Sequence, residues 1–207
     1  MKNLIVSSSP HQNSDVSTQK IMMTVIIALI PAIVASGIFF GLRAIALVAV
    51  CCSSAVLFEY LCRKLMKRPQ TISDLSAAVT GIILALNLPV TLPFWIAILG
   101  SFIAIAIVKQ LFGGLGQNFA NPAIVARIVL MVSFTSQMTT WAIPGYWKAG
   151  AFSETTAIVN SQTVFTGATP LVSQNASLSD LFFGNTGGCL GETSALALII
   201  GGVFLMV

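Results

Sequence analysis

Long, unbroken apolar runs are the feature that most restricts how this chain can fold. They cover residues 21–42, 44–62, 75–88, 92–111, 123–139 and 193–207. A run of about 20 apolar residues can cross a bilayer as a helix, and continuous rather than alternating hydrophobicity favours helices over a membrane barrel. With only 8% charged residues, the chain lacks the polar surface of a soluble domain. We therefore predict an all-α integral membrane protein, a polytopic helical bundle with five spans within 21–139.

Two runs are shorter than a full span. Residues 75–88 and 193–207 supply about 14 and 15 residues, against the roughly 20 that a crossing needs. We expect 193–207 to begin a sixth span, in a fragment of a longer membrane domain. Glycine-rich stretches at 113–118 and 187–192 each lead into an apolar run. Broken helices of this kind occur in inverted-repeat transporters, so we expect the chain to form half of such a fold. The alternative is chance similarity, because glycines are common in membrane helices.

Basic residues indicate how the chain is oriented. Arg63, Lys64, Lys67 and Arg68 follow the second run, and such clusters stay on the cytoplasmic side. Residues 1–20 form a polar arm without the apolar core of a cleavable signal peptide, so we expect a cytoplasmic N-terminus. Five spans then place residues 140–192 in one long loop on the outer side of the membrane.

Two acidic residues have local interpretations. We expect Asp74 to cap the third run as a helix start. Glu59 lies four residues before Arg63, a spacing that favours an ion pair on one helix.

Several classes of site are not indicated. The cysteines at positions 51, 52, 62 and 189 have no zinc or iron–sulfur spacing, and His11 is the sole histidine. We therefore expect no metal site and no catalytic residue in this chain. The net charge of +4 comes largely from residues beside apolar runs, so it indicates contact with membrane lipid and does not indicate nucleic-acid binding.

Within the outer loop, one polar motif combines two hydroxyls with small residues. It consists of Thr166, Gly167, Ala168, Thr169 and Pro170. Glycine and alanine let a bulky group approach the backbone, and proline stiffens the exit. The same composition is also typical of an ordinary turn.

Two further polar groups lie where glycine-rich breaks enter apolar runs. Glu192, Thr193 and Ser194 fit either a simple helix start or a polar wall beside a ligand. Asn118, Asn121 and Arg127 lie around the start of the fifth run. A charge in a membrane helix suggests a functional role, whereas snorkelling to the interface is the alternative for Arg127.

Three segments together resemble one family. Residues 109–128, 166–171 and 191–194 look like the D-type membrane subunit of the Rnf complex and the related B-type subunit of the sodium-pumping NADH:quinone reductase. The resemblance implies FMN bound through its phosphate to Thr169, attached by a flavin transferase on the outer side. It also implies a second, noncovalent flavin, such as riboflavin, whose pocket is not assigned. The family motif carries an acidic residue three positions before its first hydroxyl, where this chain has Thr163, and this departure bears on recognition by the transferase.

The resemblance implies a membrane subunit that relays electrons between ferredoxin and NAD, together with partner subunits and with coupled sodium or proton translocation. The chain itself lacks a dinucleotide fingerprint, so it would be one station in a relay. Two alternatives remain open on sequence alone. One is a solute channel or transporter without a redox cofactor, and the other is an assembly subunit with a vestigial flavin motif.

Overall fold

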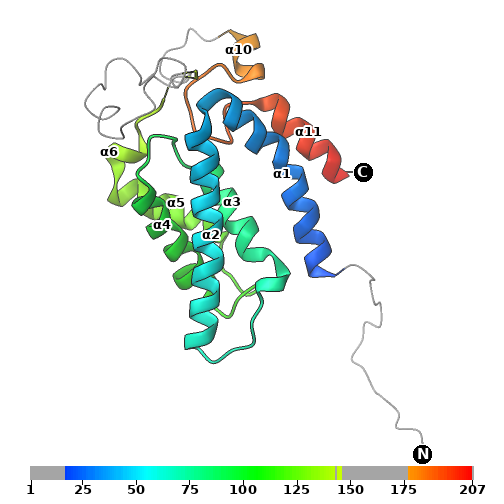
Figure 1. Cartoon of the computed structure of the whole chain (residues 1–207), viewed down its shortest axis with the longest axis vertical. Coiled ribbons are helices and arrows are strands. Elements are labelled where there is room, and N and C mark those ends of the chain that lie inside the picture. Colours follow the sequence, from blue (N-terminus) through cyan, green and yellow to red (C-terminus); the bar gives the residue numbers. More distant parts are fainter. Residues whose placement is uncertain (1–16, 143, 146–176, 207) are drawn as a thin grey trace, which may run out of the picture.

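The computed structural model describes residues 17–142, 144–145 and 177–206 (Figure 1). Every secondary-structure element in these residues is a helix. The elements are α1 (Thr18–Phe40), α2 (Leu42–Leu65), η1 (Ile72–Asp74), α3 (Ser76–Leu86), α4 (Phe94–Phe102), η2 (Ile103–Gln110), α5 (Pro122–Ser133), α6 (Thr135–Met138), α10 (Leu178–Phe183) and α11 (Ala195–Met206). The all-α membrane class predicted from the apolar runs agrees with this architecture.

Helices α1 and α2 are long and apolar enough to cross a membrane, whereas the other apolar helices have 10–17 residues. The hydroxyl of Ser17 caps α1 by accepting a hydrogen bond from the backbone N–H of Lys20, at 3.3 Å. Gly41 links the two long helices with a positive φ of 75°, a conformation that glycine adopts without steric cost. The first two predicted runs therefore form long helices, and the number of crossings stays a prediction.

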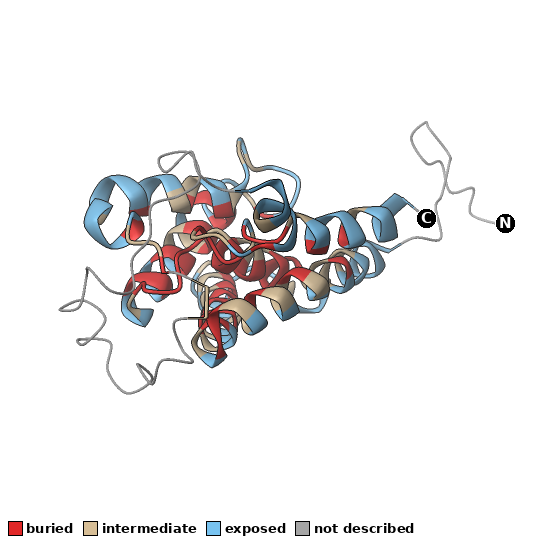
Figure 2. Ribbon diagram, turned by 90° about the horizontal axis from the view of Figure 1, so that it is seen from above, coloured by how far each residue is buried: buried red, intermediate tan, exposed pale blue. Residues whose placement is uncertain are grey.

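The core lies where α2 packs against α3 and α4, while α1 packs against α11 beside it (Figures 1 and 2). At Gly81 the backbones of α3 and α2 approach closely, because an added Cβ would lie 2.7 Å from the carbonyl oxygen of Cys51. Figure 2 shows buried residues inside the bundle and exposed ones around it. Many of the exposed side chains are large and apolar, as a surface in contact with lipid requires.

Two predicted runs differ in detail from the structure. The run at 92–111 forms α4 and then continues as η2, which is a π-helix; π-helical segments are rare and are often found at functional sites. The run at 123–139 is divided between α5 and α6, because Phe134 leaves helical geometry with φ −128° and ψ 50°.

The two glycine-rich stretches also differ from each other. Gly113, Gly114 and Gly116 have positive φ, whereas none of the glycines at 187, 188 and 191 does. Their similar composition therefore does not produce the same backbone.

Chain connections gather at the two ends of the bundle. At one end, the backbone N–H of Gly145 bonds to the carbonyl of Phe39 at 2.7 Å, and the hydroxyl of Thr91 bonds to the carbonyl of Thr140 at 2.8 Å. The basic residues that follow α2 lie at the other end (Figure 1). Thr140 and Gly145 are thus separated from the basic cluster by the length of the bundle.

Candidate functional site

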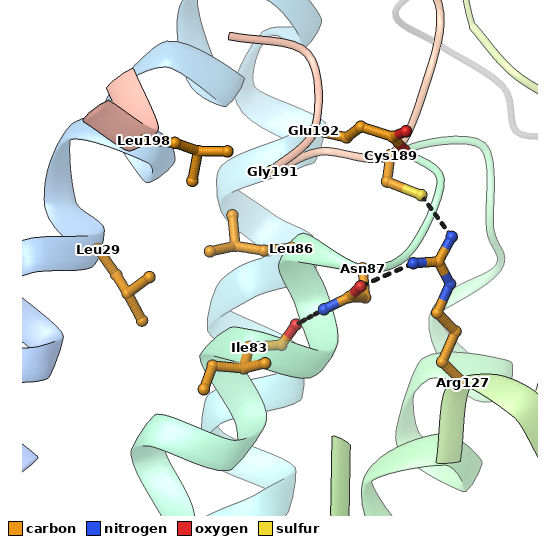
Figure 3. A pocket seen from close by; sticks show the side chains of 9 residues that line it. All are labelled: Leu29, Ile83, Leu86, Asn87, Arg127, Cys189, Gly191, Glu192 and Leu198. Carbon is orange, nitrogen blue, oxygen red and sulfur yellow. Dashed lines mark hydrogen bonds between the residues drawn. The ribbon is translucent and has the colours of Figure 1, made fainter. Parts of the chain in front are cut away.

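A cavity of about 390 Å³ opens between α1, α3, α5, α11 and the segment before α11 (Figure 3). Its lining combines leucine and isoleucine side chains with polar ones. The lining residues are Leu29, Ile83, Leu86, Asn87, Arg127, Cys189, Gly191, Glu192 and Leu198. Small-molecule sites occupy roughly 300–1,000 Å³ and are mostly apolar with a few oriented polar groups, so this cavity has the size and character of a ligand site.

The cavity exists because the segment before α11 folds back onto the end of α3. The N–H of Gly191 donates to the carbonyl of Leu86 at 2.8 Å, and the N–H of Leu190 donates to the carbonyl of Leu88 at 3.2 Å. The last carbonyls of a helix have no partner within the helix, and the bond from Gly191 satisfies that of Leu86, the last residue of α3. Glycine is needed at 191 because a Cβ there would lie 2.9 Å from the Cβ of Leu86.

Arg127 forms the polar centre of the cavity. Its Nη1 donates to the Oδ1 of Asn87 at 2.8 Å, and its Nη2 donates to the Sγ of Cys189 at 3.3 Å (Figure 3). Asn87 is held in turn, because its Nδ2 donates to the carbonyl of Ile83 at 2.8 Å. A cation at a helix C-terminus is favourable, and Arg127 occupies that position beside α3. Its side chain is therefore held by groups of the protein at this cavity.

Cys189 lies between the two charged side chains of the cavity. Burial raises the pKa of its thiol to about 12; the guanidinium of Arg127 lowers this pKa, and the carboxylate of Glu192 raises it. The thiol is therefore protonated at neutral pH. The cavity thus contains the basic side chain of Arg127 and the exposed acidic side chain of Glu192.

The predicted group at 192–194 serves two purposes. Glu192 lines the cavity, as the polar-wall interpretation requires. Ser194 starts α11, because its Oγ accepts from the N–H of Ala197 at 3.4 Å, as the helix-start interpretation requires. The hydroxyl of Thr193 between them is buried without a hydrogen-bond partner among the described residues. Ser194 therefore fits the helix-start interpretation, and the position of Glu192 is compatible with the polar-wall interpretation, which stays a prediction.

The structure does not bring Asn118 and Asn121 to this cavity, although the sequence grouped them with Arg127. Asn121 caps α5, with its Oδ1 accepting from the N–H of Ala123 at 3.0 Å. The Oδ1 of Asn118 is buried without a hydrogen-bond partner in the described part of the chain. The proposed flavin motif, Thr166, Gly167, Ala168, Thr169 and Pro170, lies outside the described residues.

Sequence reasoning missed a second buried polar cluster. The Nζ of Lys109 forms an ion pair with Glu59, at 3.0 Å to Oε1 and 2.9 Å to Oε2, and donates to the Oγ of Ser76 at 2.7 Å. Gln110 and Thr71 also donate to Oε1 of Glu59, at 3.2 and 2.8 Å. Charges embedded in apolar runs are the signal that could have identified the cluster.

The local pair expected between Glu59 and Arg63 is wrong. The Nη1 of Arg63 donates to the carbonyl of Pro69, at 3.4 Å, and the carboxylate of Glu59 is bound by Lys109 from η2. Spacing of four residues on one helix favours an ion pair only weakly, so a buried partner from another helix replaces it.

Comparison with known proteins gives consistent results. The model of the NQR2, RnfD, RnfE family matches residues 5–207. The chain is 49% identical, over 99% of its length, to the D-type subunit of the Na(+)-translocating ferredoxin:NAD(+) oxidoreductase complex of Acetobacterium woodii. It is 40% identical, also over 99% of its length, to the proton-translocating counterpart from Clostridium ljungdahlii. It is 37% identical, over 97% of its length, to the D-type subunit of the ion-translocating oxidoreductase complex of Rhodobacter capsulatus. The chain spans 62–63% of the length of these relatives.

Proposed function

The chain belongs to the NQR2, RnfD, RnfE family, and from this premise we propose that it acts as a membrane subunit of an Rnf-type ion-translocating oxidoreductase. In that complex it relays electrons between ferredoxin and NAD, coupled to translocation of sodium or protons. The observation that carries the proposal is the 49% identity to the Acetobacterium woodii protein over 99% of this chain. Its partners are the other subunits of the complex. A solute transporter without a redox role is disfavoured by the same identity.

The proposed placement is multi-pass in the prokaryotic inner membrane, with a cytoplasmic N-terminus and residues 140–192 outside. Two helices with the length and hydropathy of membrane spans support this placement. It is also supported because Thr140 and the basic residues after α2 lie at opposite ends of the bundle. We also propose that the chain forms half of an inverted-repeat fold, and this part of the proposal rests on the broken helices alone.

We further propose that FMN is esterified through its phosphate to the hydroxyl of Thr169 by a flavin transferase. The motif that precedes Pro170 supports this assignment, since Gly167 and Ala168 leave room for the cofactor beside the backbone. A bound flavin supplies electron-transfer chemistry, and the protein orients it and tunes its potential. Thr166 then serves recognition by the transferase.

Covalent attachment can be tested directly on the denatured full-length protein. The protein is produced with its complex in a host that supplies the transferase, and is analysed by in-gel fluorescence and intact mass. We expect a fluorescent band with the added mass of FMN, and loss of both with Thr169→Ala. Thr156→Ala, a threonine of the same loop outside the motif, is the matched control and retains both. A wild-type band of unmodified mass would refute the flavin proposal.

A further inference from the structure

We propose that the cavity beside Arg127 binds the pyrimidine-dione edge of a flavin ring, and that Arg127 raises the reduction potential of that flavin. This inference rests on the proposed function, because it requires that the protein carries flavin. Two sources share this chemistry, namely the flavin tethered to Thr169 and a noncovalent flavin, and the experiment below separates them.

The cavity has one apolar and one polar wall (Figure 3). The side chains of Leu29, Leu86 and Leu198 form part of the apolar wall, where a flat ring can pack. Arg127 and Glu192 provide opposite hydrogen-bonding characters on the polar wall. The dione edge of a flavin carries carbonyl and ring-nitrogen acceptors and one N–H donor. Arginine offers only donors and an ionised carboxylate offers only acceptors, so the polar wall is complementary to both kinds of group.

Arg127 is held in place and still has hydrogen-bonding capacity to offer. Its bonds to Asn87 and Cys189 employ two of the five N–H donors of a guanidinium. Asn87 is itself fixed to the carbonyl of Ile83. A side chain supported in this way by a second layer of bonds is preorganised for a ligand, and the planar fork suits recognition of an edge with adjacent acceptors.

Charge gives the direction of the effect on the flavin. Reduction places negative charge at the pyrimidine end of a flavin ring, and a nearby guanidinium stabilises that charge. Arg127 therefore raises the reduction potential. The carboxylate of Glu192, which lines the same cavity, acts in the opposite direction.

The length of chain between Thr169 and α10 limits how far the attached flavin can lie from α10. Thr169 lies eight residues before Ser177, and an extended chain of that length spans at most about 26–29 Å. Ser177 caps α10, and α10 packs against α11, whose Leu198 lines the cavity. Eight residues thus link Thr169 to a helix that packs against one wall of the cavity.

Spectroelectrochemical titration of the flavins in the purified complex tests the inference. We expect Arg127→Gln to lower one flavin potential enough to shift the ratio of oxidised to reduced flavin at least tenfold. This shift equals about 30 mV for a two-electron couple. Glu192→Gln should raise the same potential. Lys64→Gln, at an exposed position on α2, is the control and leaves every potential unchanged.

Two further arms identify the source and guard against misfolding. If the Arg127→Gln shift disappears in a Thr169→Ala background, the ligand is the tethered flavin; if it persists, the ligand is the noncovalent one. Arg127→Lys retains the positive charge and should shift the potential less than Arg127→Gln, and exposed Glu192 can be changed without disturbing the core. Unchanged potentials in the Arg127 and Glu192 variants, with FMN mass present, would overturn this inference alone. Absence of covalent FMN from the wild type would instead overturn the flavin proposal.

Discussion

The buried ion pair between Glu59 and Lys109 offers a sharp test of how this fold is stabilised. Glu59 is 0% exposed and Lys109 is 1% exposed. The ammonium group bonds both carboxylate oxygens and the hydroxyl of Ser76. Changing Lys109 to methionine keeps most of the side-chain volume but removes the positive charge. The carboxylate then stays buried with only the Gln110 and Thr71 hydrogen bonds.

The expected cost follows from this geometry. Removing one partner of a buried ion pair costs about 3–5 kcal/mol, whereas replacing both by apolar groups is often close to neutral. Lys109→Met should therefore lower the free energy of unfolding by about 3 kcal/mol, since two hydrogen bonds to Glu59 remain. The double variant Glu59→Met/Lys109→Met should cost only about 1–3 kcal/mol, because Gln110 loses its acceptor.

A double-mutant cycle measures this difference. The free energy of unfolding is obtained for detergent-solubilised protein by titration with a denaturing detergent, for the wild type, both single variants and the double variant. We expect a coupling energy of about 3 kcal/mol or more, with the double variant more stable than either single variant. The control variant Lys64→Met removes an exposed charge from the end of α2, the helix that carries Glu59. It should leave stability unchanged. Additive single effects would show that the two charges do not act as a pair.

Three shorter predictions concern the helix contacts and the cavity. Gly201→Ala should weaken the packing of α1 against α11, because the added Cβ would collide with the α1 backbone. Gly202→Ala is the control, since its Cβ would meet nothing within 4 Å, and it should retain the stability of the wild type. Unfolding of both variants in detergent measures the difference. Gly191→Ala should loosen the chain before α11, because the added Cβ would push against Leu86. Amide exchange at residues 189–191 should then be faster than in the wild type, and unchanged exchange would contradict this prediction. Because the pKa of Cys189 is raised to about 12, its alkylation rate should keep rising about tenfold per pH unit from pH 7 to 10, measured by mass spectrometry. A plateau near pH 9 would indicate an ordinary thiol.

The sequence predicted the helices because hydrophobic runs act locally. Residues 21–42 and 44–62 were expected to be helical, and α1 and α2 cover them. A dense apolar run leaves backbone groups no partner except their own helix, so such predictions need no tertiary information. The break at Phe134 and the π-helical η2 were not predicted, since the apolar runs at 92–111 and 123–139 continue through both places.

Helix caps and ion pairs were harder to predict, because other segments compete for the same groups. Asp74 was expected to cap the third run. It lies instead in the turn of η1, and α3 begins after Leu75, which has a left-handed φ of 58° and no capping side chain. For Glu59, the buried ammonium of Lys109 provides a stronger partner than Arg63 four residues away.

The candidate site was predictable only in part. Arg127 and Glu192 were singled out from their positions at breaks in apolar runs, and both line the cavity. Their proximity was not predictable, because it depends on the bonds that fold the segment before α11 onto α3. Asn87 carried a weak signal as a polar residue near the end of an apolar run, and its role appears only when Arg127 binds it.

Arg43 should control the order of the loop that connects α3 to α4. Its Nε donates to the carbonyl of Val90 at 2.8 Å, and its Nη2 donates to those of Thr91 and Leu92 at 3.4 and 3.2 Å. The guanidinium also lies over the ring of Phe94, 5.2 Å from its centroid. One cation thus holds three carbonyls of a loop that begins next to Asn87, the residue that bonds Arg127.

Arg43→Lys keeps the charge but cannot reproduce a planar fork that reaches several carbonyls. We expect amide exchange at residues 90–92 to accelerate at least tenfold, while exchange within α2 stays unchanged, as measured by hydrogen–deuterium exchange in detergent. Thr91→Val, which removes a bond to the carbonyl of Thr140, is the comparison variant and should have a smaller effect. If Arg43→Lys exchanges like the wild type, charge alone orders this loop. The hydrogen-bonding fork would then have no role in ordering the loop.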